Sequence, residues 1–342
     1  MNLPIYKKHF LLLSVLLILL FFVNISLGSV AIPFQDIFSV LVGGNSSKES
    51  WEIIILNFRI PKAITAILVG SGLSVCGLLM QTLFRNPLAG PFVLGISSGA
   101  SLGVALLLIG SSLFGGVLLS ETFTHWTLPI AASLGAFLVL SAVIITANSV
   151  RNTMSILIIG LMFGSFASAI ISVLSYFSEA TKLQQFLFWS FGSLGNLSWN
   201  ELLVLGVFYV IAMCGIFPIL KSLNSLLLGE NYAKSLGISI QKSRNIILVI
   251  TSLLTGIITA FSGPIAFVGL AVPHLARMFF TTSNHKILVP ASAIIGAIVL
   301  LICDSIAQLP TSDYTLPINA ITSIFGAPVV IWLLIRKKKL FV

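Results

Sequence analysis

Residues 59–103 read RIPKAITAILVGSGLSVCGLLMQTLFRNPLAGPFVLGISSGASLG, and this stretch decides the fold class. Two apolar runs flank a polar segment at residues 85–91, which contains two prolines that cannot continue a helical hydrogen-bond ladder. The run before it is close to the roughly 20 residues that cross the hydrocarbon core of a bilayer. Backbone groups in lipid must be paired within their own segment. We therefore expect helices near residues 61–84 and 91–110.

Small residues recur in both runs at positions where two helix backbones could approach closely. The second run carries Gly95, Gly99 and Gly103 at four-residue spacing, which predicts one smooth helix face. The first run carries Gly70, Gly72 and Gly77. Packing glycines of this kind are ordinary in membrane bundles, so they indicate the architecture and leave the activity open.

The whole chain has the composition of a membrane protein. Of its 342 residues 57% are hydrophobic and 8% charged, with a mean hydropathy of +1.12, whereas soluble domains carry roughly 25% charged residues. The apolar runs lack the period-two alternation of a β-barrel. We predict an all-α, polytopic membrane protein, a single transmembrane domain over residues 1–342 with about ten helices in one bundle. The helices are expected near residues 10–28, 61–84, 91–110, 128–147, 154–176, 201–220, 245–262, 265–279, 287–308 and 317–335.

Two segments need a separate interpretation. Residues 183–196 are too short and polar to span, so we expect an interfacial or re-entrant piece. Lys7 and Lys8 before an apolar run imitate a secretory signal peptide. Because a polytopic chain follows, we interpret this run as a retained first helix.

The basic residues predict the orientation. With ten spans and both termini in the cytoplasm, the 18 lysines and arginines lie on the inner side except Lys48, Arg59, Lys62 and Lys182. Without the short helix near residues 265–279, the basic tail at residues 336–339 would lie outside. The charges therefore favour ten spans in the cytoplasmic membrane and argue against a nucleic-acid partner.

Nothing in the sequence points to catalysis or to a bound metal or cofactor. Cys76, Cys214 and Cys303 lie within apolar runs without metal-ligand spacing, which is typical of packing thiols. The four histidines lie at scattered helix boundaries, and no paired catalytic aspartates occur. We expect no catalytic residues and no metal site.

The loop at residues 221–244, on the predicted inner side, is the most informative polar segment. Gly229 and Gly237 are good helix terminators, and Glu230 would complement the positive end of a helix that follows it. The residues between them suffice for a short helix along the inner face of the membrane. This helix would be either a solvated connector or a docking surface for a cytosolic partner.

A third segment, at residues 263–277, contains Pro273, His274 and Arg277. His274 could act as a ligand or proton relay, but its place at the inner membrane edge favours a structural role.

Together these segments resemble the permeases of binding-protein-dependent ABC importers for iron–siderophore, haem and vitamin B12, the FecCD family. The resemblance covers nearly the whole chain in one order. The first family pattern matches residues 59–100, including Gln81, Asn86, Pro87, Gly95 and Gly99. The third family pattern matches residues 263–277, including Pro273, His274 and Arg277. The family's coupling pattern matches Leu228, Gly229, Glu230, Ala233, Leu236 and Gly237.

The resemblance implies a type II importer permease that pairs with a second copy or a paralogue. Two cytosolic ATPase subunits, which bind ATP and Mg²⁺, would dock on the coupling loops, and an extracytoplasmic binding protein would dock outside. Arg59 and Lys62 match the family's outer basic contacts. Gln308 stands where the family has arginine, and Thr315 and Asn319 replace the usual Glu and Gly, so a heterodimer is mildly favoured. Ferric siderophore is the expected cargo, followed by haem and cobalamin.

The alternative is a secondary transporter driven by an ion gradient. That class needs ionisable groups near the middle of the bilayer. Asp304 is the acid that lies well inside an apolar run, and it lies toward the outer end, which is a poor place for ion coupling. An ATPase within this chain is excluded because no Walker A motif occurs.

Overall fold

The structure is a computed structural model that describes residues 3–110, 126–150, 153–308 and 314–336. Within these ranges the ordered elements are all helices, and each of the ten predicted helices is present. Seven helical segments are long and apolar enough to cross a membrane, and α5, α13 and α15 are shorter apolar helices. The ten have the bounds α1 Leu3–Ser26, α4 Ile60–Leu83, α5 Ile96–Leu108, α6 Thr127–Ser149, α7 Thr153–Tyr176, α9 Trp199–Ile216, α12 Ile240–Ser262, α13 Val268–Phe280, α14 His285–Ala307 and α15 Ile318–Arg336.

Five shorter helices lie between these spans: α2 Phe34–Leu41, α3 Glu49–Ile54, α8 Ala180–Ser190, α10 Leu220–Leu227 and α11 Glu230–Ser235. α8 covers the first half of the segment predicted to be interfacial. Its 11 residues extend about 16 Å, which is too short to cross a bilayer. The predicted inner loop is largely helical, because α10 and α11 occupy much of it.

One predicted helix begins later than expected. The chain after the proline-rich segment forms a 3-10 turn at Pro91–Leu94, and α5 starts only at Ile96. Between them Gly95 is left-handed, with φ of 73°, a conformation that glycine adopts without steric cost. The prediction that Gly95 continues one helix face with Gly99 and Gly103 was therefore wrong at Gly95.

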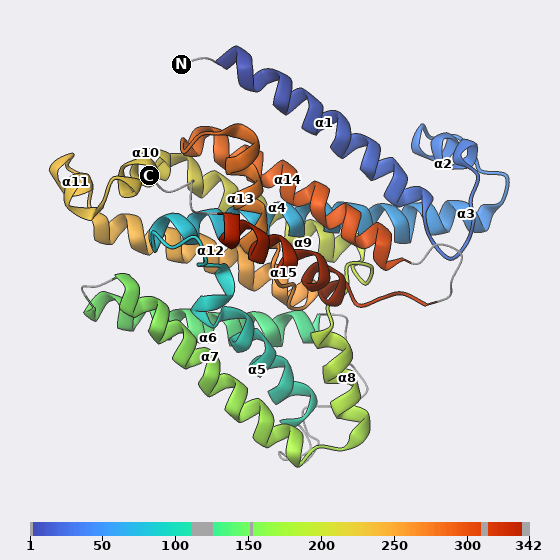
Figure 1. The fold of residues 1–342 in the computed structure, drawn as a ribbon. Helices are drawn as coiled ribbons and strands as arrows, with labels where there is room; N and C mark the ends of the chain where they lie inside the picture. The colour runs from blue at the N-terminus through green and yellow to red at the C-terminus, as the bar shows by residue number, and fades with distance from the viewer. Residues whose placement is uncertain (1–2, 111–125, 151–152, 309–313, 337–342) are drawn as a thin grey trace. The chain divides into compact units, whose positions relative to one another are not determined.

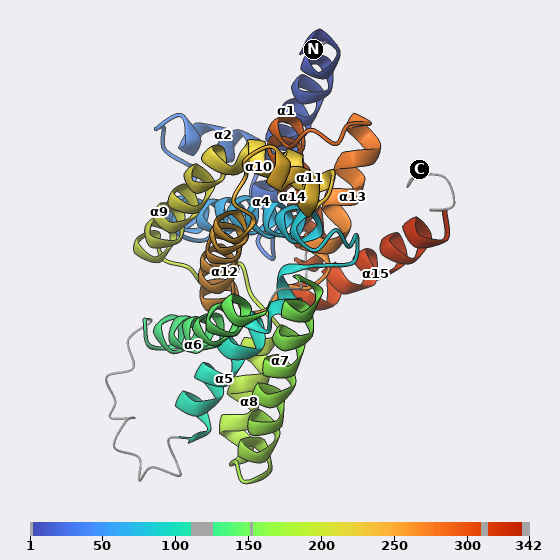
Figure 2. The same ribbon diagram turned by 90° about the vertical axis from the view of Figure 1, so that its left-hand side faces the viewer.

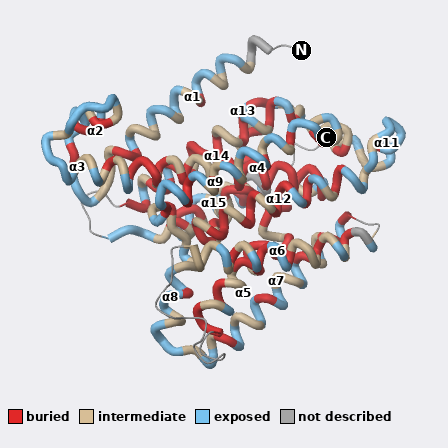
Figure 3. Tube along the Cα trace, turned by 180° about the vertical axis from the view of Figure 1, so that it is seen from behind, coloured by how far each residue is buried: buried red, intermediate tan, exposed pale blue. Residues whose placement is uncertain are grey.

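The described chain divides into two compact units, and each is described by itself. The first comprises Met1–Val75, Ser193–Gly206 and Ile265–Val342. In it α14 packs against α1, α13 and α15 (Figure 1). Figure 3 shows much of α14 buried, whereas α1 is mostly exposed or of intermediate burial. Leu11 and Leu12 are among the exposed residues of α1. An exposed apolar helix face of this kind is suited to lipid.

Glycine sets the distance between α4 and α14 in the first unit. A Cβ on Gly296 would overlap the carbonyl oxygen of Gly70 and the hydroxyl of Ser74. The two backbones approach this closely because neither Gly70 nor Gly296 has a side chain.

The second unit comprises Cys76–Gly192 and Val207–Pro264. α5 packs against α6 and α7, and α12 packs against α6 (Figure 2). A Cβ on Gly99 would lie 2.6 Å from the carbonyl oxygen of Gly135 in α6, and a Cβ on Gly95 would lie 2.6 Å from that of Gly160 in α7. The predicted close approach of glycine-bearing helices is thus present, although the two glycines meet different partners. α4 and α9 each continue from one unit into the other, and the single domain over residues 1–342 stays a prediction.

Candidate functional site

Two glycines bound the short helix in the predicted coupling segment, residues 228–237. Gly229 has φ of 109° and ψ of 154°, a region of backbone space that is essentially restricted to glycine. α11 follows, and Gly237 ends it with φ of 78°. The Gly237 and Ile238 amides donate to the carbonyls of Lys234 and Ala233, which is the Schellman pattern. Both predicted helix terminators therefore act as such.

α11 presents apolar side chains to its surroundings. Leu228, Tyr232 and Leu236 are 64%, 51% and 55% exposed and follow one another at four-residue spacing. Tyr232 and the C-cap residue Leu236 lie one turn apart on α11, whereas Leu228 precedes the non-helical Gly229; we call these three exposed residues the docking face. Ala233, on α11, is fully buried, so this helix packs against the rest of the second unit through that residue.

Glu230 connects α11 to another helix of the second unit. Its Oε1 accepts a 2.6 Å hydrogen bond from the hydroxyl of Thr153, the first residue of α7. Nearby, the Arg244 guanidinium of α12 donates to the carbonyls of Ala147 and Val150 at the end of α6, at 2.9 and 3.4 Å. The coupling segment and the start of α12 are therefore both bonded to the α6–α7 connection.

The proline-rich segment lies beside the coupling segment. Arg85 has φ of 47°, and its Nη1 lies 3.5 Å from the position of a Cβ on Gly229. Asn86 Oδ1 accepts the Leu88 amide at 2.9 Å and so stabilises the turn before α5. Two of the motifs noted in the sequence, separated by about 140 residues, thus meet.

Arg59, a predicted docking residue, is 8% exposed and serves an intramolecular purpose. Its guanidinium donates to the carbonyls of Ile25 and Ser26, at 2.8 and 3.1 Å, and to that of Val30. These carbonyls belong to the end of α1 and the residues after it, where helical partners are missing.

Lys62 and Gln308, the other two predicted docking residues, meet at one carboxylate. Lys62 Nζ lies 3.1 Å from Asp304 Oδ1. The amides of Asn24 and Gln308 donate to Asp304 Oδ2 at 2.9 and 2.8 Å. Asn24, Asp304 and Gln308 are all at most 6% exposed. The docking role of Arg59, Lys62 and Gln308 stays a prediction, and each of these side chains also has a partner within the chain.

The remaining motif residues lie in helices, where Gln81, Pro273 and His274 are buried and Arg277 is partly exposed. Gln81 in α4 is 4% exposed, Pro273 lies inside α13, and His274 follows it at 6%. Arg277 lies in the last turn of α13, where a cation complements the helix dipole. Within the described ranges no three His, Cys, Asp or Glu side chains gather as a metal site would need.

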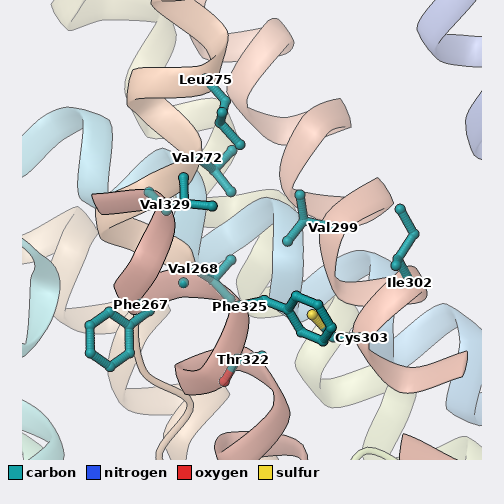
Figure 4. Close-up of a pocket in the computed structure, with 12 residues that line it drawn as sticks. Phe267, Val268, Val272, Leu275, Val299, Ile302, Cys303, Thr322, Phe325 and Val329 are labelled. Atoms are coloured by element: carbon teal, nitrogen blue, oxygen red, sulfur yellow. The ribbon is translucent and has the colours of Figure 1, made fainter. Parts of the chain in front are cut away.

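An apolar pocket of about 190 Å³ opens in the first unit between α13, α14 and α15 (Figure 4). Val272, Cys303, Phe325 and Val329 are among its lining residues. Pockets that enclose drug-sized ligands have roughly 300–1,000 Å³. This pocket is therefore too small for a haem or a corrinoid.

Sequence reasoning missed Asn24, Thr153 and Arg244. Thr153 looked like an ordinary helix start, and its partner Glu230 lies 77 residues away. Asn24 is a polar residue near the end of an apolar run, which is a weak signal that could have been followed. Asn319, noted only as a departure from the family, has a role of its own, because its Oδ1 accepts the Ala266 amide at 3.0 Å.

In the described part of the chain ten apolar helices, several of them packed through glycines, define a multi-pass membrane protein of the permease class. The chain belongs to the FecCD transport family, whose family model matches residues 16–336. It is thus a permease subunit of the type II ABC importers.

Individual relatives agree with this assignment. The vitamin B12 import system permease protein BtuC of Salmonella typhimurium is 33% identical over 296 residues, which cover 84% of this chain and 85% of BtuC. The hemin transport system permease protein HmuU of Yersinia pestis is 34% identical over 331 residues, covering 96% and 95%. A solved structure assigned to the metal-chelate type of ABC transporter, in an inward-facing conformation, has a TM-score of 0.83 and 29% identity, covering 97% of this chain and all of that one.

Proposed function

We propose that this chain belongs to an ATP-driven importer and moves an iron chelate through the cytoplasmic membrane. Ferric siderophore is the first choice of cargo; haem, or the cobalt corrinoid cobalamin, comes next. Relatives named for hemin and vitamin B12 support a bulky chelate or tetrapyrrole cargo. The spans carry few charges, and a weakly interacting path does not retain its cargo. Neither feature separates the three ligands from one another.

The observation that carries the ATP-driven part is the docking face of Leu228, Tyr232 and Leu236. Tyr232 and Leu236 are exposed on α11 and its C-cap, and Leu228 is exposed just before Gly229; Gly229, Gly237 and the buried Ala233 fix the position of this helix. An apolar helix face suits the groove of a partner protein. We propose that a cytosolic ATPase subunit binds here, and that a second permease subunit brings a second docking face.

The remaining partners follow from the same proposal. An extracytoplasmic binding protein would deliver the cargo to the outer end, near Arg59 and Lys62. Complementary charge at such a rim would guide the encounter. Because Lys62 is already paired with Asp304, an acidic group on the binding protein would have to share or replace that partner.

The test replaces Leu236 with aspartate and purifies the importer through a tag on this chain. We expect the ATPase subunit to be lost, since a charge in an apolar contact must be desolvated without a partner. Asn231→Asp, an exposed position on the same helix outside the docking face, is the matched control and should retain the subunit. Full retention of the ATPase by Leu236→Asp would contradict the proposed docking face.

The cargo needs a separate experiment. Cells that lack this chain are tested for uptake of radiolabelled ferric siderophore, haem and cobalamin, each with and without the restored gene. Restoration of ferric siderophore uptake alone is the expected result. Restoration of only haem or only cobalamin uptake would replace the first choice of cargo and leave the importer function standing.

A further inference from the structure

The connection between α6 and α7 is attached to the coupling side of the second unit at two points. Glu230 of α11 accepts a hydrogen bond from Thr153 of α7. Arg244 of α12 donates to two carbonyls at the end of α6, those of Ala147 and Val150. Of these five residues, only Glu230 belongs to the family patterns found in the sequence.

The Glu230–Thr153 bond has the properties of a firm link. At 2.6 Å between two oxygens, with a carboxylate as acceptor, it falls in the short range of charge-assisted hydrogen bonds. Thr153 is 8% exposed, so little water competes for the bond. The carboxylate also lies at the N-terminal end of α7, where the helix dipole favours a negative charge.

α7 continues from this link toward another helix contact. Seven residues after Thr153, Gly160 meets the backbone at Gly95, immediately before α5. A Cβ on Gly160 would lie 2.5 Å from the Val93 carbonyl oxygen, so the two backbones are in direct contact. α7 is a continuous helix over this distance of about 10 Å, and a displacement of its first residue is therefore passed along its axis to α5.

We infer that Thr153 is a positioning residue that transmits movement of the coupling segment to α7, through its bond to Glu230, and from α7 to α5. This inference rests on the proposed function, since the movement originates in the ATPase subunit bound at the docking face. Arg244 bonds the end of α6 to α12, so in this proposal α6 moves together with α12, while α7 moves together with α11.

The link could instead serve only to stabilise the fold, and the variants are chosen to separate these two roles. Thr153→Val removes the hydroxyl and keeps the shape, whereas Thr153→Ser keeps the hydroxyl. Glu230→Gln keeps the length of the side chain and removes its charge. Thr146→Val is the matched control, because the hydroxyl of Thr146 donates to carbonyls of its own helix, those of Ala142 and Val143.

The experiment uses the complete importer, purified with its own ATPase subunits and reconstituted in proteoliposomes. Three quantities are measured: ATPase subunit bound, ATP hydrolysed, and labelled chelate taken up per ATP. For Thr153→Val we expect bound ATPase and hydrolysis near wild type and uptake per ATP about tenfold lower, the factor that loss of one charge-assisted hydrogen bond implies. Thr153→Ser should restore the ratio, and Thr146→Val should leave it unchanged.

A double-mutant cycle shows whether the two residues act as one unit. Thr153→Val with Glu230→Gln should lower uptake per ATP no further than the stronger single change. Multiplying effects, or a wild-type ratio in Thr153→Val, would overturn the inference. If Thr153→Val does not assemble, Glu230→Gln alone must lower the ratio. If Leu236→Asp keeps the ATPase bound, the docking face fails; if it releases the ATPase while Thr153→Val keeps the wild-type ratio, only the transmission step fails.

Discussion

Lys62 Nζ lies 3.1 Å from Asp304 Oδ1, in a cluster that joins three helices of the first unit. The side-chain amides of Asn24, in α1, and Gln308, which follows α14, both donate hydrogen bonds to Asp304 Oδ2. A buried carboxylate with a cation and two amide donors is fully satisfied. That Asp304 is not an ion-coupling site stays a prediction.

Removing one partner of this pair should cost more than removing both. Asp304→Leu leaves the Lys62 ammonium without its anion, and we expect a loss of stability below the roughly 3–5 kcal/mol of a fully buried pair, because the Lys62 side chain is 21% exposed. Lys62→Met combined with Asp304→Leu should recover most of that loss. Thermal unfolding in detergent measures both. If the double variant is less stable than Asp304→Leu, the pair is not the source of the effect.

Gly→Ala changes should have different effects inside and outside the contact between α4 and α14. In Gly296→Ala the new methyl group overlaps the Gly70 carbonyl and Ser74, so a loss of about 1–3 kcal/mol is expected from overpacking. Gly206→Ala in α9 meets nothing within 4 Å and should be neutral or gain about 0.5–1 kcal/mol from helix propensity. The same unfolding assay compares them. Equal melting temperatures would contradict the close approach.

The two glycines around α11 should tolerate substitution differently. Gly229→Ala forces an alanine into a glycine-only backbone region, at a cost of about 1–3 kcal/mol, and should lower the amount of ATPase subunit bound. Gly237→Asn should be nearly silent, because asparagine tolerates the left-handed conformation and nothing lies within 4 Å of that position. Co-purification of the ATPase subunit with each variant measures the difference. Equal loss in both variants would show that the backbone of Gly229 has no special role.

The connection between α2 and α3 should loosen in acid. The hydroxyl and amide of Ser47 donate to Asp36 Oδ1 at 2.7 and 2.6 Å and lower the pKa of that carboxyl below its ordinary 3.8. A lowered pKa contributes stability above the ordinary value, and this contribution is lost as the pH falls through the value in the folded protein.

A spin label at Val42→Cys, in a background without the native cysteines, reports this change. Its mobility should stay constant from pH 7 to about 4 and rise below the ordinary pKa of aspartate. In Ser47→Ala the label should already be mobile at pH 7. Equal mobility of the two proteins at every pH would contradict the role of Ser47.

The sequence predicted the ten apolar helices of the described chain because hydropathy acts locally and lipid permits few alternatives to a helix. It also predicted Gly229 and Gly237 as helix terminators, since their effect depends on neighbouring residues only. Gly95 was wrongly predicted to lie inside a helix. The four-residue spacing of the glycines does not distinguish a glycine within a helix from a left-handed glycine just before one, which is what Gly95 is.

The side-chain partners were out of reach for a different reason. Arg59 and Lys62 were expected to meet another protein, whereas carbonyls at the end of α1 and the Asp304 carboxylate surround them in this chain. Such pairs join residues that are far apart in the sequence, 34 positions for Arg59 and Ile25, and no local pattern specifies them. Thr153 belongs to the same group, because only the fold brings it to Glu230.

The central claim is that ATP hydrolysis in a bound partner drives import through this chain. The decisive measurement is uptake of labelled chelate by proteoliposomes that contain the purified importer. ATP is supplied either on the side of the membrane where the ATPase subunits lie or on the opposite side. Uptake should require ATP on the ATPase side, persist when ionophores dissipate all ion gradients, and be lost in Leu236→Asp. Uptake by this chain without the ATPase subunit, abolished when the gradient collapses, would contradict the account and establish a secondary transporter.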